Sequence, residues 1–205
     1  MVRAAVSRRE QACWWNEVTR FTKLRTYVIC KQPERKLHLE SYLTVPHGGW
    51  NDQRLIGRRV LTRLRCGTNE LSIETGRHSG LAIADRVCPI CRAQVEDERH
   101  FLLECEHYQQ QRAALWVQID QLVQAGGQVG APAAAGAAVL GRFSSSQLPP
   151  AEQLTLLVGG YHPAIVGESL RLRVMSAILI ALGQWALMRA EYLDLYERAS
   201  AHSSV

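Results

Sequence analysis

The chain has 205 residues, of which 47% are hydrophobic and 21% charged, a composition typical of one globular domain or of a domain with an appended subdomain. A chain of this length buries most of its apolar surface without cross-links, so the six cysteines are not needed as a disulfide framework. Residues 1–15 hold no apolar run long enough for a secretory signal. We therefore expect an intracellular protein, nuclear or cytoplasmic, whose thiols are reduced and free to bind metal.

The formal net charge of +5 lies in the N-terminal half of the chain. Residues 1–112 hold 19 Lys and Arg against 13 Asp and Glu, whereas residues 113–205 hold 5 against 6. A polyanionic partner such as RNA or DNA is therefore expected to meet the N-terminal half.

The first predicted elements are helices. In residues 10–29, apolar side chains recur at spacings of three and four, which predicts a helix that Pro33 prevents from continuing. A short helical stretch is expected at residues 36–43, and Gly48 and Gly49 then indicate a loop.

A further helix is predicted from Asp52 to about Cys66, with Asn51 as its N-cap and Gly67 as its C-terminal stop. Its apolar side chains can face a core. The same helix carries five arginines, with no acidic residue between the first and the last of them: Arg54, Arg58, Arg59, Arg63 and Arg65.

These five arginines, with Arg77, are the candidate contacts to the phosphates of RNA or DNA. The alternative is a solvated basic helix face, or arginines paired with Glu70, Glu74 and the acidic run at residues 96–98.

The remaining elements are also predicted to be helical. A turn of helix is expected at residues 70–76, and a helix from near Glu96 to Val123. Residues 125–138 read AGGQVGAPAAAGAA, a low-complexity composition typical of a flexible linker. Two helices are predicted after a loop at residues 144–150. They cover residues 151–158 and 167–198.

Strand signals are sparse, so the predicted fold is mainly α with a small metal-bound element. We expect a helical domain at residues 1–124, a linker at 125–150 and a pair of C-terminal helices at 151–205.

The second C-terminal helix contains an apolar stretch of 15 residues, from Val174 to Met188. A membrane span needs about 20 apolar residues, so we predict a buried helix and no membrane partner. Trp185 and Tyr192 of this helix, or the pair Trp14 and Trp15, are expected in the core, and a contact surface for a protein partner is the alternative.

Cysteine and histidine have metal-ligand spacing in residues 88–105. Cys88, Cys91, His100 and Cys105 follow the pattern C-x2-C-x8-H-x4-C. Thiolate and imidazole are the ligands that Zn²⁺ prefers, and four protein ligands close a tetrahedral site, which indicates a structural zinc rather than a catalytic one.

The spacing of His100 and Cys105 poses a geometric problem. Residues five apart on a regular α-helix point about 140° away from each other. These two side chains can share one ion only if the helix ends or loosens near Cys105 and restarts near Tyr108. His107 is an alternative ligand, but its use leaves Cys105 without a role.

Several motifs occur together in residues 61–112: LTRLR at 61–65, ETGR at 74–77, CPIC at 88–91, VEDERHFLLEC at 95–105 and Tyr108. With these motifs the segment resembles the zinc-binding segment at the C-terminal end of the reverse transcriptases of non-LTR retrotransposons. Residues 23–31 and 185–193 resemble the flanks of that segment more weakly.

The resemblance implies a zinc-stabilised module that helps a reverse transcriptase hold its RNA template or DNA target, with the same four residues as ligands. The chain contains no Asp-Asp pair of the kind that a polymerase uses to hold Mg²⁺. A nuclease of the kind that some of these elements carry downstream would need a lysine there, but Lys23, Lys31 and Lys36, the lysines of this chain, all lie before the metal segment. We therefore expect no catalytic activity. A protein-interaction module or a retroelement remnant without function is the alternative.

Overall fold

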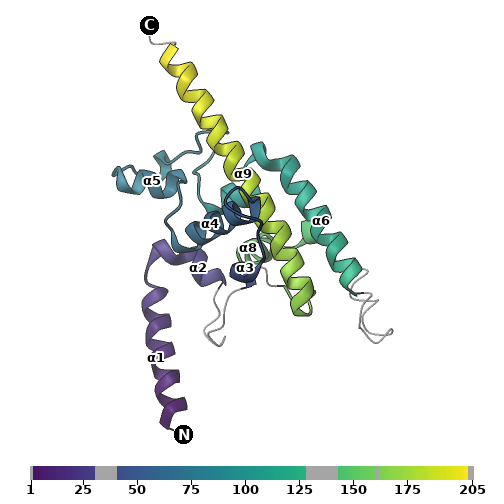
Figure 1. The fold of residues 1–205 in the computed structure, drawn as a ribbon. Helices are drawn as coiled ribbons and strands as arrows, with labels where there is room; N and C mark the ends of the chain where they lie inside the picture. The colour runs from purple at the N-terminus through teal and green to yellow at the C-terminus, as the bar shows by residue number, and fades with distance from the viewer. Residues whose placement is uncertain (1, 31–40, 128–142, 160–161, 203–205) are drawn as a thin grey trace.

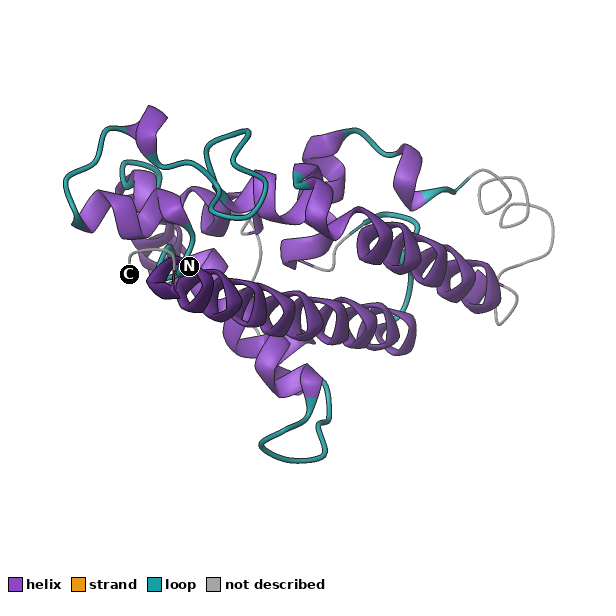
Figure 2. Cartoon of the chain, turned by 90° about the horizontal axis from the view of Figure 1, so that it is seen from above, coloured by secondary structure: helices purple, strands orange, loops and turns teal. Residues whose placement is uncertain are grey.

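The computed structural model describes residues 2–30, 41–127, 143–159 and 162–202 (Figure 1). Within these ranges the regular structure is helical and no strand is formed (Figure 2), which confirms the predicted mainly α class. The helices are α1 Val2–Val18, η1 Thr22–Leu24, α2 Arg25–Cys30, α3 Ser41–Thr44, α4 Gln53–Cys66, α5 Ser72–His78, η2 Ile83–Asp85, η3 His100–Glu104, η4 Glu106–Tyr108, α6 Gln109–Gly127, η5 Ser145–Gln147, α8 Pro150–Gly159 and α9 Glu168–His202.

The helix predicted for residues 10–29 is broken into α1, η1 and α2, so one continuous helix was wrong. At the end of α1, the N–H and the hydroxyl of Thr19 both donate to the carbonyl oxygen of Trp15. Tighter turns follow, in which the Phe21 N–H donates to Val18 and the Leu24 N–H donates to Phe21. The chain thereby turns from α1, which projects from the body, into α2 (Figure 1).

Helix α4 is confirmed almost as predicted, except that Asp52 and not Asn51 is the N-cap. The Asp52 carboxylate accepts a hydrogen bond from the Arg54 N–H, and it also accepts from the Arg54 guanidinium. This guanidinium lowers the pKa of the Asp52 carboxyl well below its usual range. Gly67 ends the helix with φ 58°, a left-handed conformation that glycine adopts without strain.

Helices α4 and α9 are in close contact at two glycines. A Cβ atom at Gly57 would lie 1.8 Å from the carbonyl oxygen of Leu179, and one at Gly183 would lie 2.3 Å from that of Gln53. The backbones approach so closely that neither position has space for a side chain. Gly183, which interrupts the apolar stretch in the sequence, is therefore a packing residue.

We expect Gly57→Ala to lower the free energy of unfolding by about 1–3 kcal/mol, because the new methyl group meets backbone that cannot move aside. In an open helix the same change stabilises by about 1 kcal/mol. Gly126→Ala is the matched control, since the atoms nearest to its Cβ would belong to the flexible side chain of Leu170 and not to backbone. Urea unfolding of both variants measures the difference. A Gly57→Ala protein more stable than the wild type would contradict this packing.

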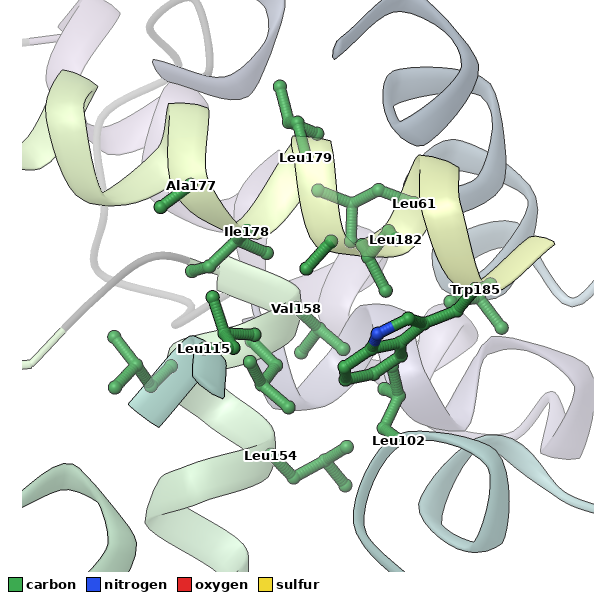
Figure 3. Packing of buried hydrophobic residues seen from close by; sticks show 14 of the residues in the cluster. Leu61, Leu102, Leu115, Leu154, Val158, Ala177, Ile178, Leu179, Leu182 and Trp185 are labelled. Atoms are coloured by element: carbon green, nitrogen blue, oxygen red, sulfur yellow. The ribbon is translucent and has the colours of Figure 1, made fainter. Parts of the chain in front are cut away.

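The centre of α9 forms the middle of the core. Val174, Ile178, Leu182 and Trp185 are fully buried, and Figure 3 shows the last three of these among the core side chains. The ring of Trp185 stacks on Tyr108 and meets Phe101 edge-on. Trp185 is thus a core residue, as expected. By length and composition α9 could cross a membrane, but just over half of its apolar window is buried inside the protein.

The core is continuous from Tyr42 to Trp185 and includes residues on both sides of the predicted linker. Most of that linker, residues 128–142, lies outside the described residues, as does most of the helical stretch predicted at 36–43. Helix α6 extends to Gly127. Helix α8, Pro150–Gly159, begins and ends one residue outside the predicted range of 151–158. The proposed domain boundaries stay a prediction.

Candidate metal centre

Four side chains converge beside the core. The Sγ atoms of the three cysteines and a ring nitrogen of His100 all lie within 4.8 Å of one another, and the cluster could hold a metal ion. The distance from Cys91 Sγ to His100 Nε2 is 3.3 Å. Cys88, His100 and Cys105 are buried, whereas Cys91 is half-buried.

The first pair of ligands comes from a tight turn. An isolated bridge pairs Val87 with Val95, and the Cys88 N–H donates to the carbonyl oxygen of Gln94 at 2.8 Å. The Arg92 N–H then donates back to the carbonyl oxygen of Cys88. Arg92 has φ 55°, a left-handed conformation that turns the chain after Cys91. The turn places both cysteine side chains on one side.

The second pair is brought together by a π-helix. Residues His100–Glu104 form η3, and the Cys105 N–H donates to the carbonyl oxygen of His100 at 2.8 Å. In a π-helix, residues five apart are joined by a hydrogen bond and lie one turn apart, so their side chains share a side. The expected loosening at Cys105 is thereby confirmed, and the chain restarts through η4 into α6.

His107 is not part of the cluster. Its ring packs edge-on against Tyr108 and Tyr192, with ring centroids 5.0 and 5.4 Å away. The four residues first expected are therefore the ones that meet.

The thiols of Cys88 and Cys105 share a hydrogen bond. Because the Cys88 thiol donates to Cys105, the pKa of Cys88 is raised well above its ordinary value, and burial raises it further. The same hydrogen bond lowers the pKa of Cys105. A metal ion would replace the shared proton, since the thiolate is the form that binds metal.

Glu96 is a buried acid beside the cluster. It is 1% exposed, and its Oε1 lies 3.7 Å from Cys88 Sγ. Its Oε2 accepts hydrogen bonds from the N–H and the hydroxyl of Ser72 and from the Arg189 guanidinium at 2.9 Å. Glu96 therefore connects the metal segment to α5 and α9. The helical pattern of the sequence predicts only that Glu96 lies in the first turn of a helix.

Comparison of the chain with protein-family models, with curated proteins and with solved structures finds no match. The likeness to the reverse-transcriptase segment stays a prediction that rests on the motifs.

Most of the predicted phosphate-binding arginines have partners within the chain. Arg54 pairs with Asp52, Arg63 with Glu70 and Arg77 with Glu74. Arg58 donates to the carbonyl oxygens of Tyr42 and Val45. The pairing of Arg63 and Arg77 with these acids was the alternative stated for the basic patch.

Arg65 is only 2% exposed, and its guanidinium lies 4.8 Å from the centroid of the Tyr42 ring. Its assignment to the phosphate-binding set was therefore wrong. Arg65 lies on the helix face of Leu61 and Leu64, which are buried, and an arginine on that face extends into the interior. Arg59 is different, because its side chain is exposed and lies over the ring of Trp50.

Proposed function

We propose that this chain is a zinc-stabilised module that binds nucleic acid and has no catalytic activity of its own, like the C-terminal segment of a retroelement reverse transcriptase that it resembles. The observation that carries the proposal is the convergence of three sulfur atoms and one imidazole nitrogen within 4.8 Å.

The donor set and its dimensions support zinc. With Zn–S bonds of about 2.3 Å and Zn–N bonds of about 2.0 Å, a tetrahedral site has a sulfur-to-nitrogen edge of about 3.5 Å. The distance of 3.3 Å between Cys91 and His100 is close to that edge. Three thiolates with one imidazole suit Zn²⁺, whereas Mg²⁺ and Ca²⁺ require oxygen ligands. Four protein ligands leave no open position for a substrate, so the zinc has a structural role.

Two arginines of α4 are the best candidates for phosphate contacts. Arg63 and Glu70 form an ion pair whose side chains are both exposed. Such a pair contributes at most about 1 kcal/mol to the free energy of unfolding. A phosphate can therefore replace the Glu70 carboxylate at little cost. Arg59 lies four residues earlier on the same helix face, and its contact with Trp50 leaves its N–H groups free of any carboxylate that the structure describes.

We expect binding of RNA or DNA that weakens linearly as the logarithm of salt concentration rises, because phosphate contacts release counterions. Fluorescence anisotropy with labelled oligonucleotides at several salt concentrations measures the slope. The double change Arg59→Gln and Arg63→Gln should reduce that slope by about 2, one for each lost contact. Arg198→Gln, which alters an exposed pair with Asp194 near the end of α9, is the matched control.

Two results would contradict the proposal of nucleic-acid binding. One is the absence of binding at low salt. The other is binding that does not depend on salt.

The alternative, a protein-interaction module that uses the apolar C-terminal helix, has less support. The central apolar side chains of α9, among them Val174, Ile178 and Trp185, are already buried by the chain itself.

A further inference from the structure

Trp50 is the most exposed large hydrophobic side chain among the described residues, at 79%. Tryptophan is rarely left in water, because burying its ring is strongly favourable. Trp50 is also not on a loose segment. The Asp52 carboxylate that caps α4 accepts a hydrogen bond from the Gly48 N–H, and the Asp52 N–H donates to the carbonyl oxygen of Gly49 at 3.1 Å. The loop therefore presents the ring from a fixed position at the start of α4.

One face of the Trp50 ring has a cationic neighbour. The guanidinium carbon of Arg59 lies 5.5 Å from the centre of the ring. A cation at this distance is attracted by the π-electrons and holds the ring in place. Since the side chain is 79% exposed, the rest of its aromatic surface is open to a flat ligand.

Arg59 also lines a groove between α4 and α9, with a cavity volume of about 310 Å³. Its lining is apolar where Leu71, Phe101, Ala186 and Ala190 contribute. The charged lining residues are Arg59, Arg63, Arg189 and Glu70, so positive charge is in excess. The same arginine thus links the exposed ring to an apolar groove.

From these contacts we infer that Trp50 and the groove between α4 and α9 bind a single strand of nucleic acid, with an unpaired base stacked on Trp50 and the phosphates of that strand held by Arg59 and Arg63. This inference rests on the proposed function. A single strand fits because its bases are free to stack on an aromatic ring while its backbone follows basic side chains. In a duplex the faces of the bases are covered by their neighbours.

The size of the groove favours part of a nucleotide strand over a protein helix. A volume of about 310 Å³ is at the lower end of the range for pockets that hold one small group. A docked amphipathic helix instead needs a groove long enough for anchors over two turns.

The test compares an oligonucleotide of 20 nucleotides as a labelled single strand and as its duplex, with Trp50→Ala, Trp50→Phe and wild type. We expect Trp50→Ala to weaken single-strand binding by roughly 5- to 100-fold and to leave duplex binding almost unchanged. Trp50→Phe keeps an aromatic face and should retain most of the affinity. Phe21→Ala removes another exposed aromatic side chain, 61% exposed and outside the groove, and should have no effect.

The outcomes separate the inference from the proposed function. Salt-dependent binding that Trp50→Ala leaves unchanged overturns the stacking site and leaves the proposed function standing. No binding of either form of nucleic acid by the wild type overturns both. If poly-glutamate of matched charge displaces the strand as well as unlabelled oligonucleotide does, the groove is a surface for acidic proteins, which also overturns the inference.

Discussion

Cys88→Ser is expected to abolish stoichiometric zinc binding and to unfold at least the segment from Val87 to Tyr108. In small zinc-binding peptides the free energy of binding a structural zinc ion is about 10–16 kcal/mol. This is comparable to or larger than the free energy of unfolding of a whole domain, about 5–15 kcal/mol. Cys88 is buried, and its Sγ atom lies within 4.8 Å of the other three ligand atoms of the cluster. Circular dichroism should show a loss of helical signal, because η3, η4 and the start of α6 depend on the position of Cys105.

Cys13→Ser is the matched control for this experiment, since Cys13 is exposed and lies on α1, outside the cluster. It should bind zinc and melt like the wild type. A chelator added to the wild-type protein should reproduce the effect of Cys88→Ser. Full helicity and an unchanged melting temperature of the Cys88→Ser protein would contradict a role for the metal in folding.

Arg189→Met is expected to lower the free energy of unfolding by about 3–5 kcal/mol, because it leaves the buried Glu96 carboxylate without its charged partner. The Arg189 side chain is 11% exposed, and its guanidinium donates to Glu96 at 2.9 Å and to the carbonyl oxygen of Glu70 at 3.2 Å. The N–H and hydroxyl of Ser72 still donate to Glu96 in the variant, but neither carries a positive charge. Chemical unfolding with urea measures the loss.

The double change Glu96→Gln with Arg189→Met is the informative companion. Removal of both charges should recover most of the stability lost in Arg189→Met, because a neutral amide has a much smaller desolvation cost than an unpaired carboxylate. If the double variant is as unstable as the single one, the loss comes from the packing of Arg189 and not from its charge.

The ligand set could be predicted from the sequence because metal-ligand spacing is local. Cys88 and Cys91 are joined by one turn, and the five-residue step from His100 to Cys105 already required a departure from a regular helix. The sequence did not show which departure occurs. In the structure the departure is a π-helix, which ends in a hydrogen bond from the Cys105 N–H to the carbonyl oxygen of His100.

Contacts between residues far apart in the chain could not be predicted in this way. Arg189 is 93 residues from its partner Glu96, and no spacing rule connects them. The close approach of α4 to α9 at Gly57 is of the same kind, because it depends on where Leu179 lies in space.

The burial of Arg65, in contrast, was visible in the sequence. Arg65 lies four residues after Leu61 and one residue after Leu64. These three positions share one face of a helix. The long apolar stem of an arginine can lie along such a face, here with its guanidinium over the Tyr42 ring.

X-ray absorption spectroscopy of the purified protein at the zinc edge tests the central claim most directly. We expect about one zinc per chain, bound by three sulfur atoms at about 2.3 Å and one nitrogen atom at about 2.0 Å. Protein without stoichiometric zinc, or zinc surrounded mainly by oxygen, would contradict a site formed by Cys88, Cys91, His100 and Cys105.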